Sequence, residues 1–336
     1  MRRLRATVLV LTAVLTLGMA GCVAGEDTSG DGEGAGTWST DTLAIDFATY
    51  NPLSLVVKDQ GWLEQELDGV RVTWTQSAGS NKANEGLRSA ALDVGSTAGS
   101  AALLARANGS PIKAIDIYSQ PEWSAIVVPE ASGIRSVADL RGKSVAATKG
   151  TDPYFFLLQA LDEAGVPLDA VEVQNLQHAD GRAALDNGSV DAWAGLDPIM
   201  AAAQAESGAR LLYRNIDFNS YGFLNAREDF LADHRDVAQV VVDAYERART
   251  WASDHPDELV ALLAEVAGID REVAATVIEE RTVLDLDPVP GEAQRKVLEV
   301  VGPIFVASGD VASQADVDRA LDELFEPALA GEARNG

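Results

Sequence analysis

Short runs rich in β-branched and aromatic residues alternate with segments of helical pattern over roughly residues 40–225 of this chain. Such alternation is typical of α/β proteins, in which helices cover the faces of largely parallel sheets. One helix is expected over 153–164, because it opens with Pro153 and Gly165 follows it. The expected strands are 43–47, 70–75, 112–118, 125–128, 144–147, 171–175, 191–194 and 210–213.

The pattern changes after about residue 227, where apolar residues take helical spacing. One long amphipathic face is carried by Val237, Val240, Val241, Ala244, Tyr245, Ala248 and Trp251. Only helices are expected from there to about residue 325. This order predicts two lobes, with the C-terminal helices returning to pack on the first. Lobe 1 is expected to comprise 41–128 and 223–330, and lobe 2 to comprise 129–222, with crossings near 128–129 and 221–225.

The N-terminus has the pattern of a bacterial export signal. Three arginines within the first five residues precede an apolar run over 6–17, and small residues lead into Cys22. The run is shorter than the roughly 20 residues that a membrane span needs. We expect 1–21 to be removed and Cys22 to carry a lipid that anchors the protein to the outer face of the cell membrane. A chance cysteine beside a cleavage site is the alternative.

Composition and net charge restrict the classes of partner that this chain can bind. Residues 22–40 are Gly-rich and acidic and predict a flexible tether. A formal net charge of −26 argues against nucleic acid as a partner and against docking on anionic headgroups. Because Cys22 is the only cysteine, the chain cannot form an internal disulfide.

Catalytic and metal-binding patterns are absent from the sequence. The three histidines are far apart, and with one cysteine no Cys/His zinc cluster can form. The segment 95–99 has Thr where a nucleophile elbow has Ser, and 142–144 lacks the first glycine of a P-loop. We therefore expect no catalytic residue, no metal and no cofactor.

Two strand–turn–helix segments predict a binding site instead. Ser96 and Thr97 are expected where a helix begins, and Gly150, Thr151 and Asp152 precede the helix expected from 153. Free N–H groups at a helix N-terminus favour an anionic or hydrogen-bonding group. Plain helix capping is the alternative for each. In two facing lobes, both turns would close over one ligand.

Aromatic residues near expected strand ends could form the walls of such a site. They are Tyr50, Trp123, Tyr154, Trp193 and Tyr221, and each has a core position as its alternative. Trp193 is favoured because 193–198 has the pattern of a strand-end turn.

Several stretches resemble the substrate-binding proteins of the sulfonate/nitrate/taurine ABC importer family. They are 136–145, 149–151, 161–165, 179–185 and 188–193 with 197–198, within a resemblance that spans roughly 42–325. The resemblance implies an α/β, two-lobed periplasmic-binding-protein fold of type II with extra C-terminal helices packed on the first lobe. It also implies a monomer that performs no catalysis and delivers a small molecule to a membrane permease.

The resemblance also implies site residues, because members of this family hold an anionic group at helix N-termini in the cleft. It assigns contacts to Ser96, Thr97, Gly150 and Thr151, a lining role to Trp193 and Asp197, and contacts in the first turn to Tyr50 and Asn51. Asp152 and Glu122, the latter beside Trp123, depart from the pattern, because a carboxylate within about 4–6 Å of a sulfonate is repulsive. Either Asp152 turns away and caps its helix, or the ligand carries an amine or is neutral.

The ligand therefore stays open at this point. An aliphatic sulfonate is the first hypothesis, and taurine, nitrate, a pyrimidine precursor of thiamine or another heterocycle are alternatives within the same fold. A pyrimidine-synthesising enzyme would need a Cys-rich motif that this chain lacks. A sensory or structural lipoprotein is the remaining alternative.

Overall fold

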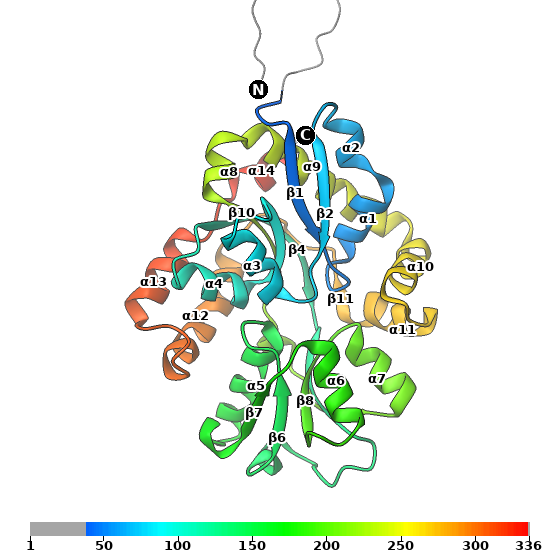
Figure 1. The fold of residues 1–336 in the computed structure, drawn as a ribbon, viewed down its shortest axis with the longest axis vertical. Helices are drawn as coiled ribbons and strands as arrows, with labels where there is room; N and C mark the ends of the chain where they lie inside the picture. The colour runs from blue at the N-terminus through cyan, green and yellow to red at the C-terminus, as the bar shows by residue number, and fades with distance from the viewer. Residues whose placement is uncertain (1–37, 335–336) are drawn as a thin grey trace, which may run out of the picture. The chain divides into compact units, whose positions relative to one another are not determined.

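Two β-sheets organise residues 38–334, the part of the chain that the computed structural model describes (Figure 1). The predicted signal sequence 1–21, Cys22 and most of the predicted tether 22–40 lie outside the described residues. The predicted tether extends too far at its C-terminal end, over residues 38–40. Ser39 donates its backbone N–H to Asp236 at 2.9 Å and contacts His234 Nδ1 at 3.0 Å, so it is fixed to the start of a helix.

The first sheet has six strands in the order β11-β4-β10-β3-β1-β2. β1 runs parallel to β2 and β3, whereas β10 is antiparallel to β3 and β4, and β11 is antiparallel to β4. The strands are β1 Thr42–Phe47, β2 Arg71–Gln76, β3 Val94–Ala98, β4 Ile112–Pro121, β10 Gly222–Arg227 and β11 Thr282–Val283.

The second sheet has five strands in the order β7-β6-β8-β5-β9. β6 is parallel to β7 and β8, and β5 is antiparallel to β8 and β9. The strands are β5 Ser124–Val128, β6 Ser144–Ala147, β7 Glu172–Asn175, β8 Ala192–Leu196 and β9 Arg210–Tyr213.

Helices fill the intervals between these strands. They are α1 Pro52–Gln60, α2 Trp62–Glu66, α3 Ser80–Arg88, α4 Gly99–Ala107, α5 Asp152–Glu163, α6 His178–Asp186, α7 Ile199–Ser207, α8 Glu228–Asp233, α9 Arg235–Asp254, α10 Pro256–Ala267, α11 Arg271–Ala275, α12 Glu292–Ala307, α13 Gln314–Glu323 and α14 Ala328–Ala333. Short helices are η1 Val137–Leu140, η2 Leu168–Ala170, η3 Ile216–Phe218 and η4 Thr276–Glu280.

Each predicted strand is present, and the helix predicted over 153–164 is α5. β3 is the strand of the first expected strand–turn–helix segment, and two further strands, β10 and β11, were missed. β10 carries the polar Asn225 at a fully buried position, where its amide nitrogen donates to Thr97 Oγ1 at 2.8 Å. The expectation of helices alone after residue 227 is wrong at β11, a strand of only two residues whose pairing with β4 is a tertiary contact.

The first sheet is covered on both faces at β10, where successive side chains point to opposite faces. On β10, Leu224 packs into one core with α1, α9 and α10, while Phe223 packs into a second core with α4, α12 and α13. This second core continues past β5 of the other sheet and α5. A third core lies under α6 and α7.

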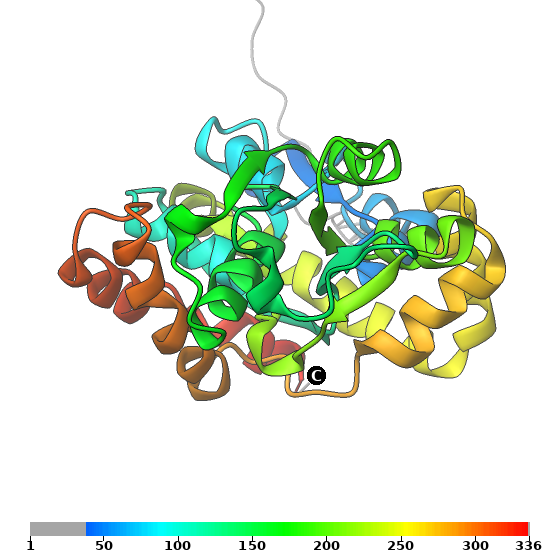
Figure 2. The same ribbon diagram turned by 90° about the horizontal axis from the view of Figure 1, so that it is seen from below.

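The C-terminal helices pack on the first sheet's helices as predicted, but α12 also reaches the second sheet's side. The ring of Phe305 on α12 lies 4.5 Å from that of Phe155 on α5. Seen from below, the orange-red C-terminal helices project on one side of the green segments and the gold helices project on the other (Figure 2).

The lobe boundary predicted near 128–129 does not match the sheets. β5, expected in lobe 1, pairs with β8 from Ser124 to Val127 and belongs to the second sheet. The physical reason is that β4 already ends at Pro121, so the chain leaves the first sheet there. We propose that the lobes follow the sheets, with the first crossing at 122–123 and the second near 221.

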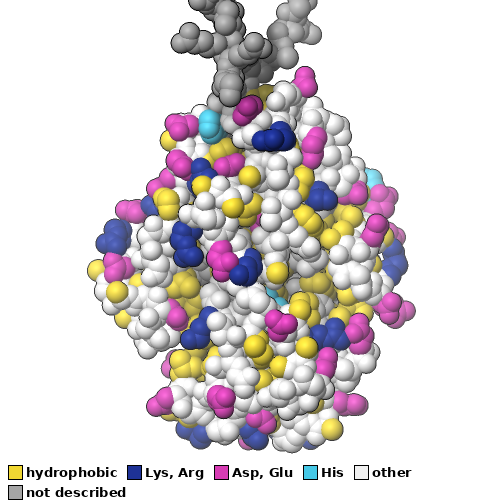
Figure 3. Space-filling model, viewed as in Figure 1, with side chains coloured by type: hydrophobic (Ala, Val, Ile, Leu, Met, Phe, Trp, Pro, Cys, Tyr) yellow, Lys and Arg dark blue, Asp and Glu magenta, His cyan; other side chains and the backbone are white. Residues whose placement is uncertain are grey.

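The surface offers no basic stripe on the face shown in Figure 3, where Lys and Arg side chains are scattered among Asp and Glu. Within residues 38–334, none of the helices combines the length and the apolar character needed to cross a bilayer.

Candidate ligand-binding site

Tyr50 and Trp123 meet at the junction of the two sheets. Tyr50 follows β1 in the first sheet, and Trp123 lies on the crossing between β4 and β5. Their rings are 6.0 Å apart at an interplanar angle of 82°, an edge-to-face arrangement. Tyr50 is fixed further by its hydroxyl, which donates to Ser96 O at 2.9 Å.

Two small cavities lie against this aromatic pair. One has a volume of about 10 Å³ and is also lined by Asp197 and Arg281. The other is lined by Ala98, Thr151 and Asp152 and has no room for a water-sized sphere. A single water needs about 10–15 Å³ of such space. A small organic molecule can therefore enter only if the two sheets move apart.

Asp152, the first residue of α5, accepts four hydrogen bonds at this junction. Its Oδ1 accepts from Ser100 Oγ at 2.5 Å and Ser220 Oγ at 2.7 Å. Its Oδ2 accepts from Trp123 Nε1 at 2.7 Å and Ser220 N at 2.8 Å. Burial raises the pKa of Asp152, and these hydrogen bonds offset part of that rise.

Asp197 and Arg281 form a buried ion pair beside the first cavity. Arg281 Nη1 lies 2.9 Å from Asp197 Oδ2, and Arg281 Nη2 donates to Gln204 Oε1 at 2.6 Å. Asp197 Oδ1 also accepts from Ala201 N at 2.9 Å. Burial raises the pKa of Asp197, and the charge of Arg281 lowers it in part. The positive charge of Arg281 is therefore already matched by Asp197.

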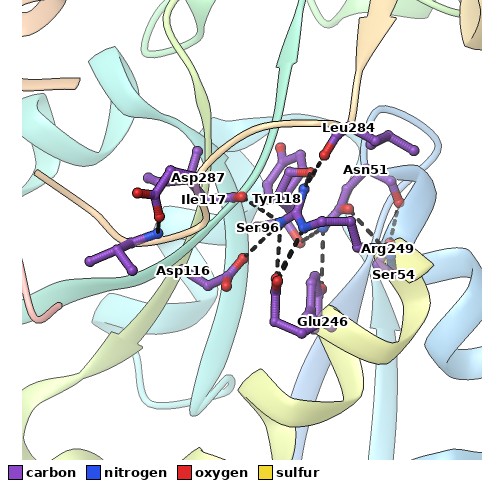
Figure 4. A network of polar contacts seen from close by, with 12 residues as sticks. Asn51, Ser54, Ser96, Asp116, Ile117, Tyr118, Glu246, Arg249, Leu284 and Asp287 are labelled. Carbon is purple, nitrogen blue, oxygen red and sulfur yellow. Dashed lines mark hydrogen bonds and ion pairs between the residues drawn. The ribbon is translucent and has the colours of Figure 1, made fainter. Parts of the chain in front are cut away.

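A buried polar network lies behind Tyr50. Asn51 Nδ2 donates to Ser96 Oγ at 2.8 Å and to Tyr245 OH at 3.2 Å (Figure 4). The N–H and hydroxyl of Ser96 both donate to Asp46 Oδ1, at 2.8 and 2.9 Å. Burial raises the pKa of Asp46 to about 6, and hydrogen bonds from Ser77 and Ser96 offset part of that rise.

A second, partly buried cation, Arg249, lies near this network (Figure 4). Its Nη2 lies 3.1 Å from Glu246 Oε1 and 3.7 Å from Asp116 Oδ1. Arg249 also donates through Nη2 to Ile117 O and through Nη1 to Leu284 O, both at 2.7 Å. Burial, together with the charge of Glu246, raises the pKa of Asp116. Arg249 thus stabilises the sheet edge and leaves no charge free for a ligand.

Comparisons with known proteins decide the family. The sequence model of the NMT1/THI5-like family matches residues 52–259. This chain belongs to the NMT1/THI5-like family of solute-binding proteins. A relative from Escherichia coli K12, named for the binding of aliphatic sulfonates, is 29% identical over 76% of this chain and 80% of its own length. A relative of the same name from Bacillus subtilis 168 is 30% identical over 82% of this chain and 83% of its own length.

A solved structure confirms the predicted fold. The alkanesulfonate-binding protein SsuA from Xanthomonas axonopodis pv. citri, bound to MOPS, has a TM-score of 0.75 at 25% identity and covers 84% of this chain and 98% of its own. The fold is therefore that of a periplasmic binding protein. Members of this family bind solutes, and this protein is not an enzyme. Within residues 38–334, no group of three or more His, Cys, Asp or Glu side chains could hold a metal ion.

The structure of this binding protein brings five of the predicted site residues together at the cavities. They are Tyr50, Trp123, Thr151, Asp152 and Asp197. Gly150 lies close by, in the turn ahead of α5 with φ +78°, where a Cβ would lie 3.7 Å from Asn81 Cβ on α3. Asn51 lies behind Tyr50, fully buried.

The expectation that Ser96 and Thr97 begin a helix is wrong. Both lie in β3, which continues to Ala98, and α4 begins at Gly99. Pairing with β10 extends the strand, and both side chains are buried. The hydroxyl at the start of α4 belongs instead to Ser100.

Two further predicted residues lie away from the cavities. Trp193 is fully buried in the core beneath α6, where a Cβ on Gly181 would meet its ring at 2.8 Å. Glu122 turns outward and accepts two hydrogen bonds from Arg214, at 2.9 and 2.5 Å. Ligand contacts by these residues have no support in this geometry.

Three residues of the junction were missed from the sequence. Ser100 and Ser220 are ordinary serines in sequence, and only the fold brings both to Asp152. Arg281 lies 84 positions from Asp197. No local pattern connects these residues, so only a three-dimensional contact could have revealed them.

Asp46→Asn should remove a pH-dependent loss of stability. The pKa of Asp46 is raised from 3.8 to about 6, so the protonated form stabilises the fold below about pH 4, and this contribution is lost as the pH rises through about 6. The ionised carboxylate then costs about 3 kcal/mol. The unfolding free energy of the variant minus that of wild type should therefore rise by about 3 kcal/mol from about pH 4 to about pH 8. Urea unfolding at the two pH values measures this difference.

The control for this experiment is Asp59→Asn, an exposed position on α1. It should change the unfolding free energy only slightly, as a substitution at a solvent-exposed position does. A free-energy difference between wild type and Asp46→Asn that does not change with pH would contradict the account of Asp46.

Proposed function

We propose that this protein is the solute-binding component of an ABC importer and that its ligand is an aliphatic sulfonate held between the two lobes. The observation that carries the proposal is the junction itself, where Tyr50 and Trp123 meet the start of α5 and the end of β3. The names of the relatives from Escherichia coli and Bacillus subtilis and of the Xanthomonas structure supply the ligand class.

The two halves of the site come from opposite sheets. α4 starts at Gly99 directly after β3, and α5 starts at Asp152 after the turn at Gly150. Helix N-termini favour an anionic group such as a sulfonate. The rings of Tyr50 and Trp123 offer apolar surface to an alkyl chain. Opening at the crossings 122–123 and 221 would admit the ligand, and closure would exclude water from it.

An amine-bearing sulfonate such as taurine is the second candidate. Asp152 and Asp197 line the cavities, and the one cation that lines them among the described residues is Arg281, already paired with Asp197. A ligand ammonium group would offset part of the negative charge of the two carboxylates. Nitrate offers no apolar part to the aromatic pair, and a pyrimidine offers no anionic group to the helix starts.

A ligand panel tests the proposal. The purified protein should bind one alkanesulfonate per monomer, and ligand at 100 times its Kd should stabilise the fold by about 2.7 kcal/mol. Thermal unfolding against alkanesulfonates, taurine, nitrate and pyrimidines measures this, with calorimetry for stoichiometry. Stabilisation by nitrate or pyrimidines alone, or by none of the compounds, would reject the sulfonate assignment.

A pair of tyrosine variants serves as the positional control in the same titration. Tyr50→Leu removes a ring that lines both cavities and should weaken binding roughly tenfold. Tyr213→Leu changes a tyrosine on β9 that instead contacts Glu163, and it should leave the affinity unchanged.

We further propose that the protein acts as a monomer outside the cytoplasm, anchored through a lipid on Cys22. A body that hands its ligand to a membrane permease must stay near the membrane, and a lipid on a tether achieves this. The support for the anchor is the sequence pattern ahead of Cys22.

Cys22→Ala should move the protein from the membrane fraction to the soluble fraction of its host, because no thiol remains to accept the lipid. Fractionation followed by immunoblotting measures this. Val23→Ala leaves the thiol in place and should stay with the membrane. Membrane retention of the Cys22→Ala protein would reject the anchor.

A further inference from the structure

Asp152 ties together parts of the molecule that must separate when a ligand enters. Its carboxylate belongs to α5 of the second sheet's half. Its donors are Ser100 on α4 of the first sheet's half, Trp123 on the first crossing, and Ser220 beside the second crossing. One side chain therefore connects both halves and both crossings.

The Asp152 carboxylate also occupies hydrogen-bond donors that an incoming anion would use. The N–H of Ser100, in the first turn of α4, donates to Ser220 Oγ at 3.0 Å, and Ser220 Oγ in turn donates to Asp152. The indole N–H of Trp123 is likewise directed at Asp152. Because Asp152 is only 2% exposed, no other acceptor can reach these groups while its hydrogen bonds persist.

The charges around the cavities reinforce this competition. A sulfonate brought beside the Asp152 carboxylate would be repelled by it. Arg281 offsets little of that repulsion, because its charge is already balanced by Asp197 and its Nη2 bonds Gln204, which leaves its Nε–H as the guanidinium donor without a partner. An anionic ligand must therefore displace Asp152 from its donors rather than bind next to it.

We propose that Asp152 is an internal competitor of the ligand, a carboxylate latch that favours the closed arrangement of the lobes and sets the affinity and selectivity of the site for anions. When a ligand binds only the open protein, its apparent affinity is its intrinsic affinity multiplied by the fraction of molecules that are open. The latch lowers that fraction, and its charge adds repulsion. Asp152 is thus a specificity-determining residue. This inference deepens the proposed function and rests on it for the identity of the anion.

Three variants of the full chain test the latch. Asp152→Ala frees the donors Trp123 Nε1 and Ser220 N for an anion. Asp152→Asn removes the charge but keeps one carbonyl oxygen that can still accept from these two donors, while its amide nitrogen can only donate. Asp162→Ala is the control, because Asp162 is an exposed acid on the same helix.

Two readouts separate the latch from the ligand assignment. In ligand-free protein, small-angle scattering should give Asp152→Ala a radius of gyration about 1 Å larger than wild type, with no change for Asp162→Ala. In calorimetric titrations, Asp152→Ala should bind butanesulfonate at least about tenfold more tightly than wild type, and Asp152→Asn should show a smaller gain.

Unchanged scattering of Asp152→Ala, or affinity for butanesulfonate equal to or weaker than wild type, would overturn the proposal. If Asp152→Ala does not fold, the same two readouts on Asp152→Asn decide the question. If no form of the protein binds any sulfonate, the proposed function fails, whereas the scattering of the ligand-free variants still decides whether Asp152 holds the lobes closed.

Discussion

The carboxylate of Asp152 is the contact on which the junction of the two sheets depends. It is buried, and four hydrogen bonds compensate its charge. A buried carboxylate without such donors would be strongly destabilising. The donors come from α4 and from both chain crossings, so their positions are fixed together. The small cavities beside Tyr50 and Trp123 lie directly against this arrangement.

The other buried and partly buried charges near the junction are compensated in the same way. Arg281 pairs with Asp197, and Arg249 interacts with Glu246 and Asp116. Removing one member of such a pair leaves an unbalanced charge at a cost of several kcal/mol. A ligand that carries charge into this junction must therefore bring its own compensation or exchange it with groups already present. The charges that are already paired at the junction therefore restrict which charged ligands the site can accept.

The regular parts of the fold could be predicted from the sequence, because period-two strands and helix punctuation are local signals. α5 and the strands of the second sheet are examples. The start of α4 could not be predicted, because β3 is extended through Ser96 and Thr97 by pairing with β10, which lies more than a hundred residues away. The same holds for Trp193, whose sequence suits a strand-end turn but whose ring is enclosed beneath α6.

Site chemistry was predictable only in part. Tyr50, Trp123, Thr151, Asp152 and Asp197 stand at turns that the alternation of strands and helices identifies, and the structure brings them together. Ser100, Ser220 and Arg281 acquire their roles from tertiary contacts alone. The sequence raised the question of whether Asp152 faces a ligand or turns away, and the structure adds a third possibility, since Asp152 binds the groups that an anion would need.

A crystal structure of the protein with butanesulfonate tests the central claim most directly. The account predicts the sulfonate between the starts of α4 and α5, with the alkyl chain against Tyr50 and Trp123 and with the hydrogen bonds from Ser100 and Ser220 to Asp152 broken. A sulfonate bound elsewhere, or a junction in which those hydrogen bonds persist beside the bound ligand, would contradict it.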